Sequence, residues 1–374
     1  MTLQDQLTDT IEHQLSTVTQ PAPDLPGAVR RGRRIRRRRS LVAFALPVAA
    51  VTVLTAVALG TARTESTPPE AGSRPEKFAP VGMLDYSEGL RAFASPDADG
   101  QVSIGGKSFP VKDKGYLDTD ATATPFGLVF FDRAGQAHLL AQDGTDRTLA
   151  PAPARKGPHV RLSAKADVRL PLVAFTQPGA DGVAVLLSNL DTAGPVDRID
   201  VPCAGSECEK VRVDGLDQGL VFVRTGAGTF VWDPDAREDA QWTLLGKGAF
   251  RVADARDGHV LWSAAPAEPA ADSPVADWKF VRGEIDAELS HDGRHVLYWS
   301  ARLKPTTPAG RTIELRVKDA IWFAFDTDGS VLAAVGGVGQ RSTVYDCELP
   351  SGACERIGSV STNSGDPMFI GTDM

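Results

Sequence analysis

Four cysteines are the residues in this sequence whose chemistry depends most on their spacing. Cys203 and Cys208 flank the four-residue loop AGSE, and Cys347 and Cys354 flank the six-residue segment ELPSGA. In an oxidising compartment the simplest arrangement is two cross-strand disulfides, Cys203 to Cys208 and Cys347 to Cys354. A four-cysteine zinc site is the rival, but the second pair is spaced too widely for a usual zinc knuckle. We therefore expect disulfides and no metal centre.

Acidic pairs at alternate positions could belong to calcium loops. Asp97 and Asp99 form one such pair, and Asp326 and Asp328 form the other. Neither segment continues to the bidentate glutamate or the further carboxylates that a hard cation needs. Turn formation explains both pairs, because aspartate and glycine favour tight turns.

The sequence contains none of the common catalytic or cofactor motifs. It lacks G-x-S-x-G, H-E-x-x-H, the phosphate-binding G-x-x-x-x-G-K-[ST] and a G-x-G-x-x-G after a strand. His291 and His295 bracket an Asp-Gly turn at Gly293, where we expect them to be solvated. No catalytic residue, cofactor or metal ligand is therefore assigned.

A short pattern recurs through the long C-terminal part: a turn with aspartate and glycine, followed by an apolar or alternating run. Intervals of 35, 47, 37, 39, 35 and 36 residues separate its glycines. A strand-rich repeat near forty residues, without helical periodicity, predicts an all-β fold, a β-propeller of seven blades, with six or eight as alternatives. The repeat glycines are Gly100, Gly135, Gly182, Gly219, Gly258, Gly293 and Gly329.

Three of these segments carry a family resemblance. SHDGRHVLYWS resembles the turn that opens blades in WD40-like and TolB-like propellers. DQGLVFVRTGAGTFVWD resembles a WD40 strand, turn and strand ending in Trp232 and Asp233, and STVYDCELPSGACERIG resembles a closing hairpin with Tyr345 and Asp346 in that place. The resemblance implies a propeller over roughly residues 82–360. Active sites of such folds are assembled from several blades, so missing motifs do not exclude an enzyme.

The N-terminal region predicts membrane insertion. Residues 41–62 contain no charge and are long enough to cross the roughly 30 Å hydrocarbon core of a bilayer as a helix. By the positive-inside rule, the basic cluster ahead of them keeps the N-terminus in the cytoplasm and sends residues 81–374 to the extracytoplasmic side of the plasma membrane. A Pro-rich linker, 63–80, separates the two parts. The cluster consists of Arg30, Arg31, Arg33, Arg34, Arg36, Arg37, Arg38 and Arg39.

Other interpretations of this region stay open. Small residues near Gly60 would allow cleavage of a signal peptide, but forty residues ahead of the apolar run are too many for the usual n-region. RRSLV fits a loose twin-arginine signal. A nucleic-acid arm would not need a span behind it, and the rest of the chain, with 32 basic and 44 acidic residues, is unsuited to phosphate binding. We expect no nucleic-acid partner.

The cytosolic tail, 1–40, begins with a short amphipathic segment. Leu3, Leu7, Ile11, Leu15 and Val18 fall on one face of a helix, and acidic residues lie elsewhere on it. An acidic polar face disfavours a membrane-surface helix. A cytosolic protein partner is the functional interpretation, and a frayed tail is the alternative.

Three functions follow from this organisation. The first is a non-enzymatic, membrane-anchored propeller that binds a protein, peptide or glycan outside the cytoplasm. The second resembles membrane-bound anti-sigma regulators, although the zinc-binding H-x-x-x-C-x-x-C of one such group is missing. The third is a propeller hydrolase or lyase acting on extracellular polymers. Carboxylates and a histidine converging in the central channel would count against the first.

Overall fold

The described part of the chain is built from short strands joined by tight turns. The computed structural model describes residues 89–94, 101–110, 121–132, 134–153, 159–237, 241–248, 250–263, 273–284, 287–298, 301–336, 341–361 and 368–369. The chain divides into two compact units, Met1–Ala71 and Gly72–Met374, and every described residue belongs to the second. The tail 1–40, its arginines, the expected span 41–62 and the linker 63–80 lie outside the described residues.

Within the described residues the strands form seven sheets, numbered here in chain order. Sheet 1 contains β27 (Met368–Phe369), β1 (Phe93–Ala94), β2 (Gln101–Ile104) and β3 (Lys107–Pro110), and sheet 2 contains β4 (Thr122–Thr124), β5 (Gly127–Phe131), β6 (Ala137–Leu140) and β7 (Asp146–Thr148). Sheet 3 contains β8 (Ala164–Ala166), β9 (Leu172–Pro178), β10 (Gly182–Asn189) and β11 (Gly194–Pro202). Sheet 4 contains β12 (Arg212–Asp217), β13 (Leu220–Arg224), β14 (Gly228–Trp232) and β15 (Trp242–Lys247).

Sheets 5 to 7 follow in the same manner. Sheet 5 contains β16 (Arg251–Arg256), β17 (His259–Ser263) and β18 (Lys279–Arg282). Sheet 6 contains β19 (Glu288–Leu289), β20 (His295–Leu297), β21 (Arg302–Pro305) and β22 (Ile313–Glu314). Sheet 7 contains β23 (Ala320–Phe325), β24 (Val331–Val335), β25 (Arg341–Cys347) and β26 (Cys354–Ser361). A short 3-10 helix, η1 (Gly205–Lys210), joins sheet 3 to sheet 4.

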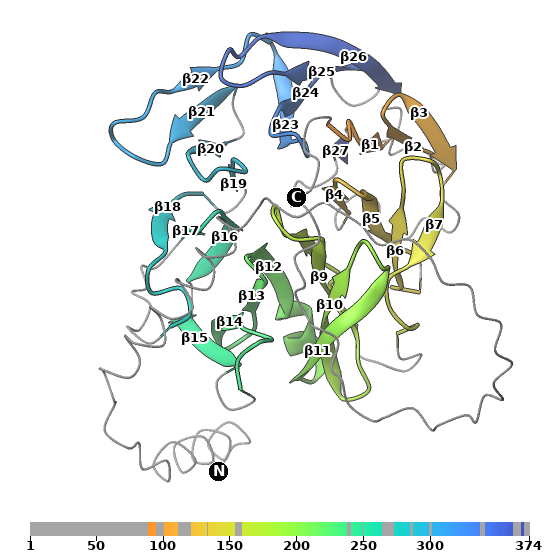
Figure 1. Ribbon diagram of the computed structural model, residues 1–374, viewed down its shortest axis with the longest axis vertical. Coiled ribbons are helices and arrows are strands. Elements are labelled where there is room, and N and C mark those ends of the chain that lie inside the picture. The colour runs from red at the N-terminus through yellow and green to blue at the C-terminus, as the bar shows by residue number, and fades with distance from the viewer. Residues whose placement is uncertain are drawn as a thin grey trace, which may run out of the picture. The chain divides into compact units, whose positions relative to one another are not determined.

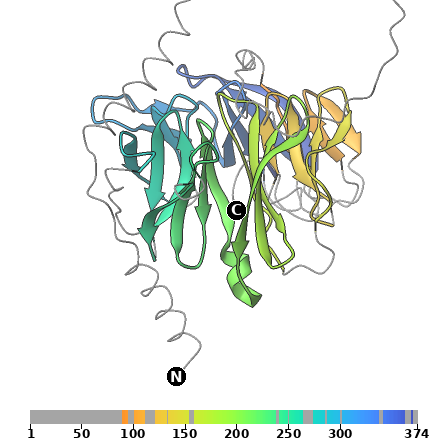
Figure 2. The same ribbon diagram turned by 60° about the horizontal axis from the view of Figure 1, so that its bottom comes forward.

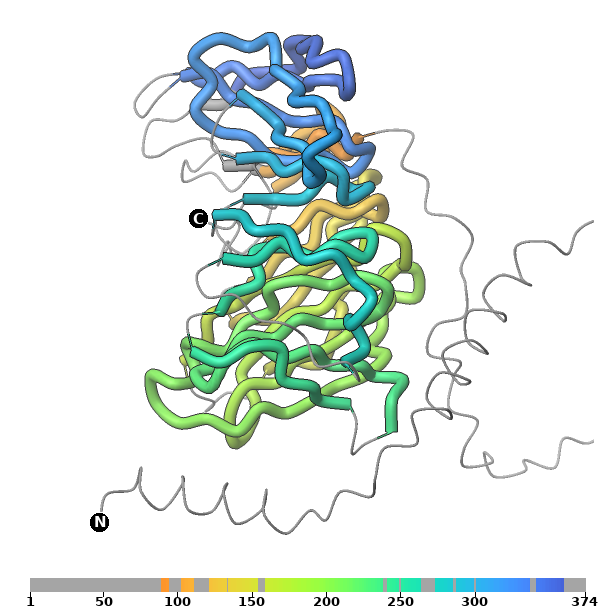
Figure 3. The backbone as a smooth tube through the Cα atoms, turned by 90° about the vertical axis from the view of Figure 1, so that its left-hand side faces the viewer, coloured from red at the N-terminus to blue at the C-terminus, as the bar shows by residue number. Residues whose placement is uncertain are grey.

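The sheets stand side by side around a central axis, which makes this unit a β-propeller (Figure 1). The chain runs to and fro between the two faces of the ring (Figures 2 and 3). The ring is closed in sheet 1, where β27 from the C-terminal end pairs antiparallel with β1, so that Phe93 lies opposite Phe369. The predicted all-β propeller is confirmed.

The number of complete blades differs from the seven that the repeat predicts. Six of the sheets formed by the described residues have four strands, and sheet 5 has three, with β18 parallel to β17. The sequence between β17 and β18 contains Pro266, Pro269 and Pro274. Proline has no N–H to give to a strand ladder, so this sequence disfavours the antiparallel return strand found in the other sheets.

The repeat also changes register along the chain. Gly219, Gly258, Gly293 and Gly329 lie between the first and second strands of sheets 4 to 7. Gly135 lies between the second and third strands of sheet 2, and Gly182 begins the third strand of sheet 3. Gly100 lies outside the described residues. The shared Asp-Gly chemistry marks tight hairpins in general, and the sequence alone does not show which hairpin of a blade each one closes.

Apolar side chains fill the space between neighbouring sheets. Strand β9 is buried along nearly its whole length because sheets 2 and 4 cover its two faces. Outer strands are more exposed: β11 is only partly covered, and β7 is exposed throughout. Each sheet therefore depends on its two neighbours for burial, and this dependence holds the ring together.

Both expected disulfides form. Cys347 and Cys354 face each other across β25 and β26, with 3.9 Å between their Cα atoms, as a cross-strand bridge. Cys203 and Cys208 also pair, with 5.2 Å between their Cα atoms, but Cys208 lies in η1. The expectation of two cross-strand bridges is therefore wrong for this pair, because the chain turns into a 3-10 helix after β11 instead of returning as a strand.

No helix in the described ranges has both the length and the apolarity that crossing a bilayer requires.

The short loops closed by the disulfides predict a modest stabilisation. Replacing Cys347 and Cys354 together by serine should lower the free energy of unfolding by about 2 kcal/mol, because a short closed loop removes little entropy from the unfolded chain. Urea unfolding of the double variant measures this effect. The Cys203→Ser, Cys208→Ser double variant should lose a similar amount, and loss of the folded state in either case would contradict this peripheral role.

Candidate functional site

The acidic and histidine candidates from the sequence lie in two different places. In the turn after β23, Asp326 accepts the N–H of Thr327 at 2.7 Å, and Asp328 accepts that of Ser330 at 2.9 Å. This is turn chemistry, as expected, and no cluster of metal-ligating residues occurs among the described residues. Asp97 and Asp99 lie outside them. His295 borders an outer groove, whereas His291 lines the centre of the ring.

The centre of the ring encloses a small polar cavity. Its volume is about 40 Å³, enough for about three water molecules. His291, which we expected to be solvated, is half-buried at this cavity, and burial lowers its pKa to about 3. The ionisable groups that line the cavity are Lys165, Asp167, Asp254, Arg256, Glu288, His291 and Asp326. Carboxylates and a histidine thus converge in the channel, the arrangement that counts against a purely binding role.

The carboxylates of the inner strands are engaged in holding the ring. Asp254 on β16 accepts a hydrogen bond from the backbone N–H of Leu289 in sheet 6 at 3.0 Å. Glu288 on β19 accepts one from the N–H of Phe325 in sheet 7 at 3.2 Å. Each carboxylate therefore links its own sheet to the next.

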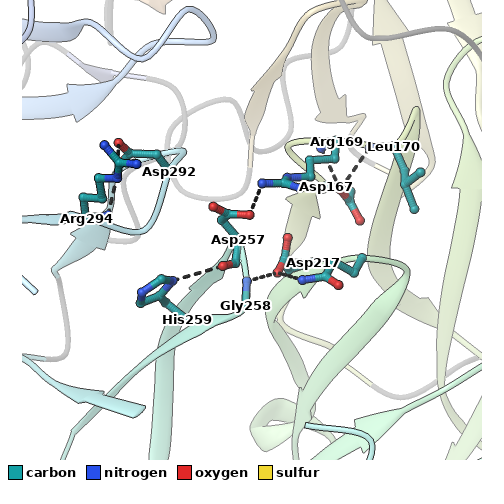
Figure 4. A network of polar contacts seen from close by, with 10 residues as sticks. Asp167, Arg169, Leu170, Asp217, Asp257, Gly258, His259, Asp292 and Arg294 are labelled. Atoms are coloured by element: carbon teal, nitrogen blue, oxygen red, sulfur yellow. Dashed lines mark hydrogen bonds and ion pairs between the residues drawn. The ribbon is translucent and has the colours of Figure 1, made fainter. Parts of the chain in front are cut away.

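Turn carboxylates continue this pattern around the ring. Asp167 accepts the N–H of Gly219 at 2.9 Å. Asp217 accepts that of Gly258 at 2.8 Å (Figure 4). Asp326 accepts the N–H of Arg91 at 2.8 Å, which brings sheet 7 to sheet 1. These five carboxylates are here called the inter-sheet carboxylates. Each accepts a hydrogen bond from the next sheet in chain order, beginning at sheet 3 and ending with the bond from sheet 7 to sheet 1. They are Asp167, Asp217, Asp254, Glu288 and Asp326.

Burial changes the acidity of these groups. Desolvation raises the pKa of Asp167 and of Asp326 to about 6 and that of Glu288 to about 7. Burial alone would lower the pKa of Arg256, but the charges of Asp254 and Glu288 outweigh it and raise that pKa. Arg256 also donates to Asp254 from Nε at 2.9 Å. The cavity thus holds the Arg256 cation beside the carboxyls of Asp254 and Glu288, and Glu288 exchanges a proton near neutral pH.

This chemistry suits a general acid, but the space does not suit a substrate. A group with a pKa near 7 can donate and accept protons at neutral pH. Glu288 meets this condition, yet it faces only the water-sized cavity and already holds the backbone of β23. Among the described residues the channel has room for a few water molecules and not for a polymer chain.

An ion pair between Arg169 and Asp257 lies on the face that carries the turns between first and second strands. It joins the turn after β8 in sheet 3 to the turn after β16 in sheet 5, passing over the intervening sheet 4 (Figure 4). Asp257 has a positive φ of 50° and is followed by Gly258 at 71°, the two-residue hairpin geometry that presents the Asp257 side chain outward.

On the same face, a large open groove extends outward from Asp257 across sheets 5, 6 and 7. Its volume is about 1080 Å³, in the size range of ligand sites. The turn after β19 and the long loop between β21 and β22 supply most of its wall. Lining residues are Asp257, His259, Lys279, Asp292, Arg294, His295, Thr306, Thr307, Gly310, Arg311, Thr312, Ile313, Glu314, Arg316, Pro350 and Ser351.

The acids of the groove already have cationic partners. Asp257 pairs with Arg169, Asp292 with Arg294 at 3.6 Å, and Glu314 with Arg302 at 3.3 Å. Three further cations line the groove and form no ion pair with any described residue, namely Lys279, Arg311 and Arg316. These three, here called the uncompensated cations because no described acid pairs with them, contribute to a lining of four cationic and three acidic side chains, a formal charge of +1 on a chain whose net charge is −8.

Sequence reasoning missed both the inter-sheet carboxylates and the groove. Asp254 and Glu288 precede Asp-Gly turns in ADARDG and AELSHDG, a signal that is visible only once those turns are placed after innermost strands. The groove brings together residues from three sheets, which no local pattern reveals.

Comparison with known proteins assigns no family to this chain. The sequence matches no protein-family profile and no curated protein. Among solved structures it is similar to TolB from Acinetobacter baumannii (12% identity, TM-score 0.34, 74% of this chain and 64% of that chain). It is also similar to PorZ of Porphyromonas gingivalis, a surface component of the type-IX secretion system (12%, 0.36, 76% and 39%), and to Pyrococcus horikoshii acylaminoacyl peptidase (10%, 0.36, 69% and 47%).

The chain spans less than two thirds of the length of each of these three proteins. Their names describe different roles, and none of these roles is assigned to this chain.

Removing one inter-sheet carboxylate should weaken the ring. Asp217→Ala leaves the partly buried N–H of Gly258 without its acceptor and should lower the free energy of unfolding by about 1–3 kcal/mol. Asp217→Asn should cost clearly less, because only one oxygen of Asp217 is hydrogen-bonded within the described residues and burial already raises the pKa of this carboxyl. Urea unfolding, with the exposed Asp191→Ala as control, measures both; equal losses for Ala and Asn would contradict this role.

The raised pKa of Glu288 predicts a pH-dependent stability. The folded state holds this proton more tightly than the unfolded state, so the stabilisation is complete below pH 4.5 and is lost as the pH rises through about 7. Between these pH values the wild type should lose about 2 kcal/mol of unfolding free energy that Glu288→Gln does not lose. This is less than the full pKa difference implies, because water in the cavity solvates part of the charge.

Urea unfolding of wild type and Glu288→Gln at several pH values tests this. His291, whose pKa is lowered to about 3, acts in the opposite sense: its stabilisation is present above pH 6.5 and is lost as the pH falls. Because wild type and Glu288→Gln both contain His291, most of its contribution cancels when their free energies of unfolding are subtracted. Identical pH profiles would show that Glu288 does not titrate in this window.

Proposed function

We propose that the chain is a single-pass membrane protein whose propeller lies outside the cytoplasm and acts as a binding module without catalysis. The observation that carries the binding role is the open groove with its uncompensated cations, beside a channel too small for a ligand of polymer size. A surface recess that contains cations without a partner among the described acids is suited to an external ligand.

The proposed location draws on three features. The arginines at 30–39 directly precede the uncharged segment 41–62, and more acidic than basic residues follow it. All four cysteines are in disulfides, which persist in oxidising compartments. Residues 1–40 would then lie in the cytoplasm, where the apolar stripe of the tail offers a surface to a protein partner.

Cysteine labelling tests this topology, because the native cysteines are paired and do not react. In intact cells a membrane-impermeant maleimide should label Ser66→Cys in the linker, and it should label Ser16→Cys in the tail only after permeabilisation. The reverse pattern would refute the orientation. A mature chain lacking residues 1–60 would show instead that the apolar segment is a cleaved signal.

The polar channel supports a second candidate, a hydrolase or lyase that opens its centre to reach Glu288. The specific observation is the pKa of about 7 of this carboxyl beside Arg256 and His291. Screening the full chain against extracellular glycans and peptides, with Glu288→Gln as the inactive control, distinguishes the two. Turnover by the wild type that is lost in Glu288→Gln would favour the enzyme. No turnover, with ligand binding by both wild type and Glu288→Gln, would favour the binding module.

A further inference from the structure

We propose that the groove across sheets 5, 6 and 7 binds an acidic peptide segment of a partner protein. This inference rests on the proposed binding function and adds the chemical class of the ligand. Arginine clusters recognise acidic motifs because the guanidinium fork matches the two oxygens of a carboxylate.

The backbone around the three uncompensated cations is held in place. The N–H of Lys279 donates to the carbonyl of Gly258 at 2.9 Å, and the N–H of Arg316 donates to that of Gly352 at 2.7 Å. The carbonyl of Arg311 lies 3.3 Å from Nε2 of His295. Anchoring these residues before binding reduces the ordering cost when a ligand arrives.

The size and lining of the groove favour a peptide over other anions. About 1080 Å³ is far more than a single phosphate or carboxylate fills, so the ligand is an extended chain. Its lining contains hydroxyl groups from Thr307 and Thr312 but no Phe, Tyr or Trp, and its only aromatic rings are the imidazoles of His259 and His295. Single-stranded nucleic acids are usually held by stacking of successive bases on several aromatic rings, which two imidazoles supply poorly. Hydroxyl and guanidinium groups suit the carboxylates and amides of an acidic peptide.

The charge of the remaining chain adds selectivity. The chain has 48 acidic and 40 basic residues, so most of its surface repels an acidic partner. A locally basic groove on an acidic protein both attracts such a partner and fixes where it docks.

The test uses the full chain in detergent micelles and a fluorescent oligoglutamate peptide, with binding followed by anisotropy. The double variant Arg311→Glu, Arg316→Glu should bind at least about tenfold more weakly, since two favourable charge contacts become repulsive. Arg311→Lys, Arg316→Lys should show a smaller loss, because lysine keeps the charge and loses the bidentate geometry. Wild-type affinity should also fall as salt is added.

The matched control is Lys107→Glu, Arg147→Glu. These two exposed cations lie on β3 and β7, in sheets 1 and 2, and their reversal changes the net charge by the same amount. Binding by this variant should stay within about twofold of wild type, because the reversed charges are remote from the groove. Equal weakening in both double variants would show that binding follows net charge and would overturn the proposed site.

Polygalacturonate, polyphosphate and oligolysine are the comparison probes. The proposal is supported if oligoglutamate binds more tightly than the other three probes and if Arg311→Glu, Arg316→Glu, the groove variant, weakens that binding. If polygalacturonate or polyphosphate binds more tightly, again sensitive to that variant, the peptide assignment fails and the binding module stands. If no probe binds in a groove-dependent manner, the proposal fails together with the main support for the binding function.

Discussion

The hydrogen bond from a buried carboxylate to the backbone of the next sheet is the interaction on which this propeller depends. A blade of four short strands buries neither of its faces alone, and apolar packing between sheets is not directional. The inter-sheet carboxylates add a directional constraint. An oxygen of Asp217 can accept the N–H of Gly258 only when sheets 4 and 5 are placed at one particular height relative to each other along the ring axis. The same reasoning applies to Glu288 and the N–H of Phe325. Packing holds the sheets together, and these bonds set their register.

This use of carboxylates determines what the centre of the ring can do. Charged groups in a confined space need partners, and here Arg256 and backbone N–H groups provide them. The groups that look most like catalytic residues, Glu288 and His291, are therefore part of the framework. The turns of sheets 5 to 7, in contrast, carry cations that the framework does not use, and this difference separates the structural centre from the candidate binding surface.

Much of the architecture could be predicted from the sequence, because it depends on local chemistry. Asp-Gly turns at intervals near forty residues indicate repeated hairpins, and cysteine spacing indicates the two disulfides. The register was not predictable, since the turns at Gly182 and Gly219 look alike and close different hairpins. Nor was sheet 5 fully predictable: the prolines between β17 and β18 disfavour an antiparallel return strand, but they do not show that β18 pairs parallel with β17. His291 was assigned to solvent because its turn is polar, but the innermost position of β19 places it in the cavity.

The central claim is that ligands meet this protein at the groove and not in the channel. Hydrogen–deuterium exchange of the full chain, with and without a saturating oligoglutamate peptide, tests it directly. Slower exchange confined to residues 279–282 and 306–316 is the expected result, because these segments form the basic part of the groove. Unchanged exchange there, with slowing at residues 254–256 and 288–291 of the inner strands, would place the ligand in the channel and contradict the account.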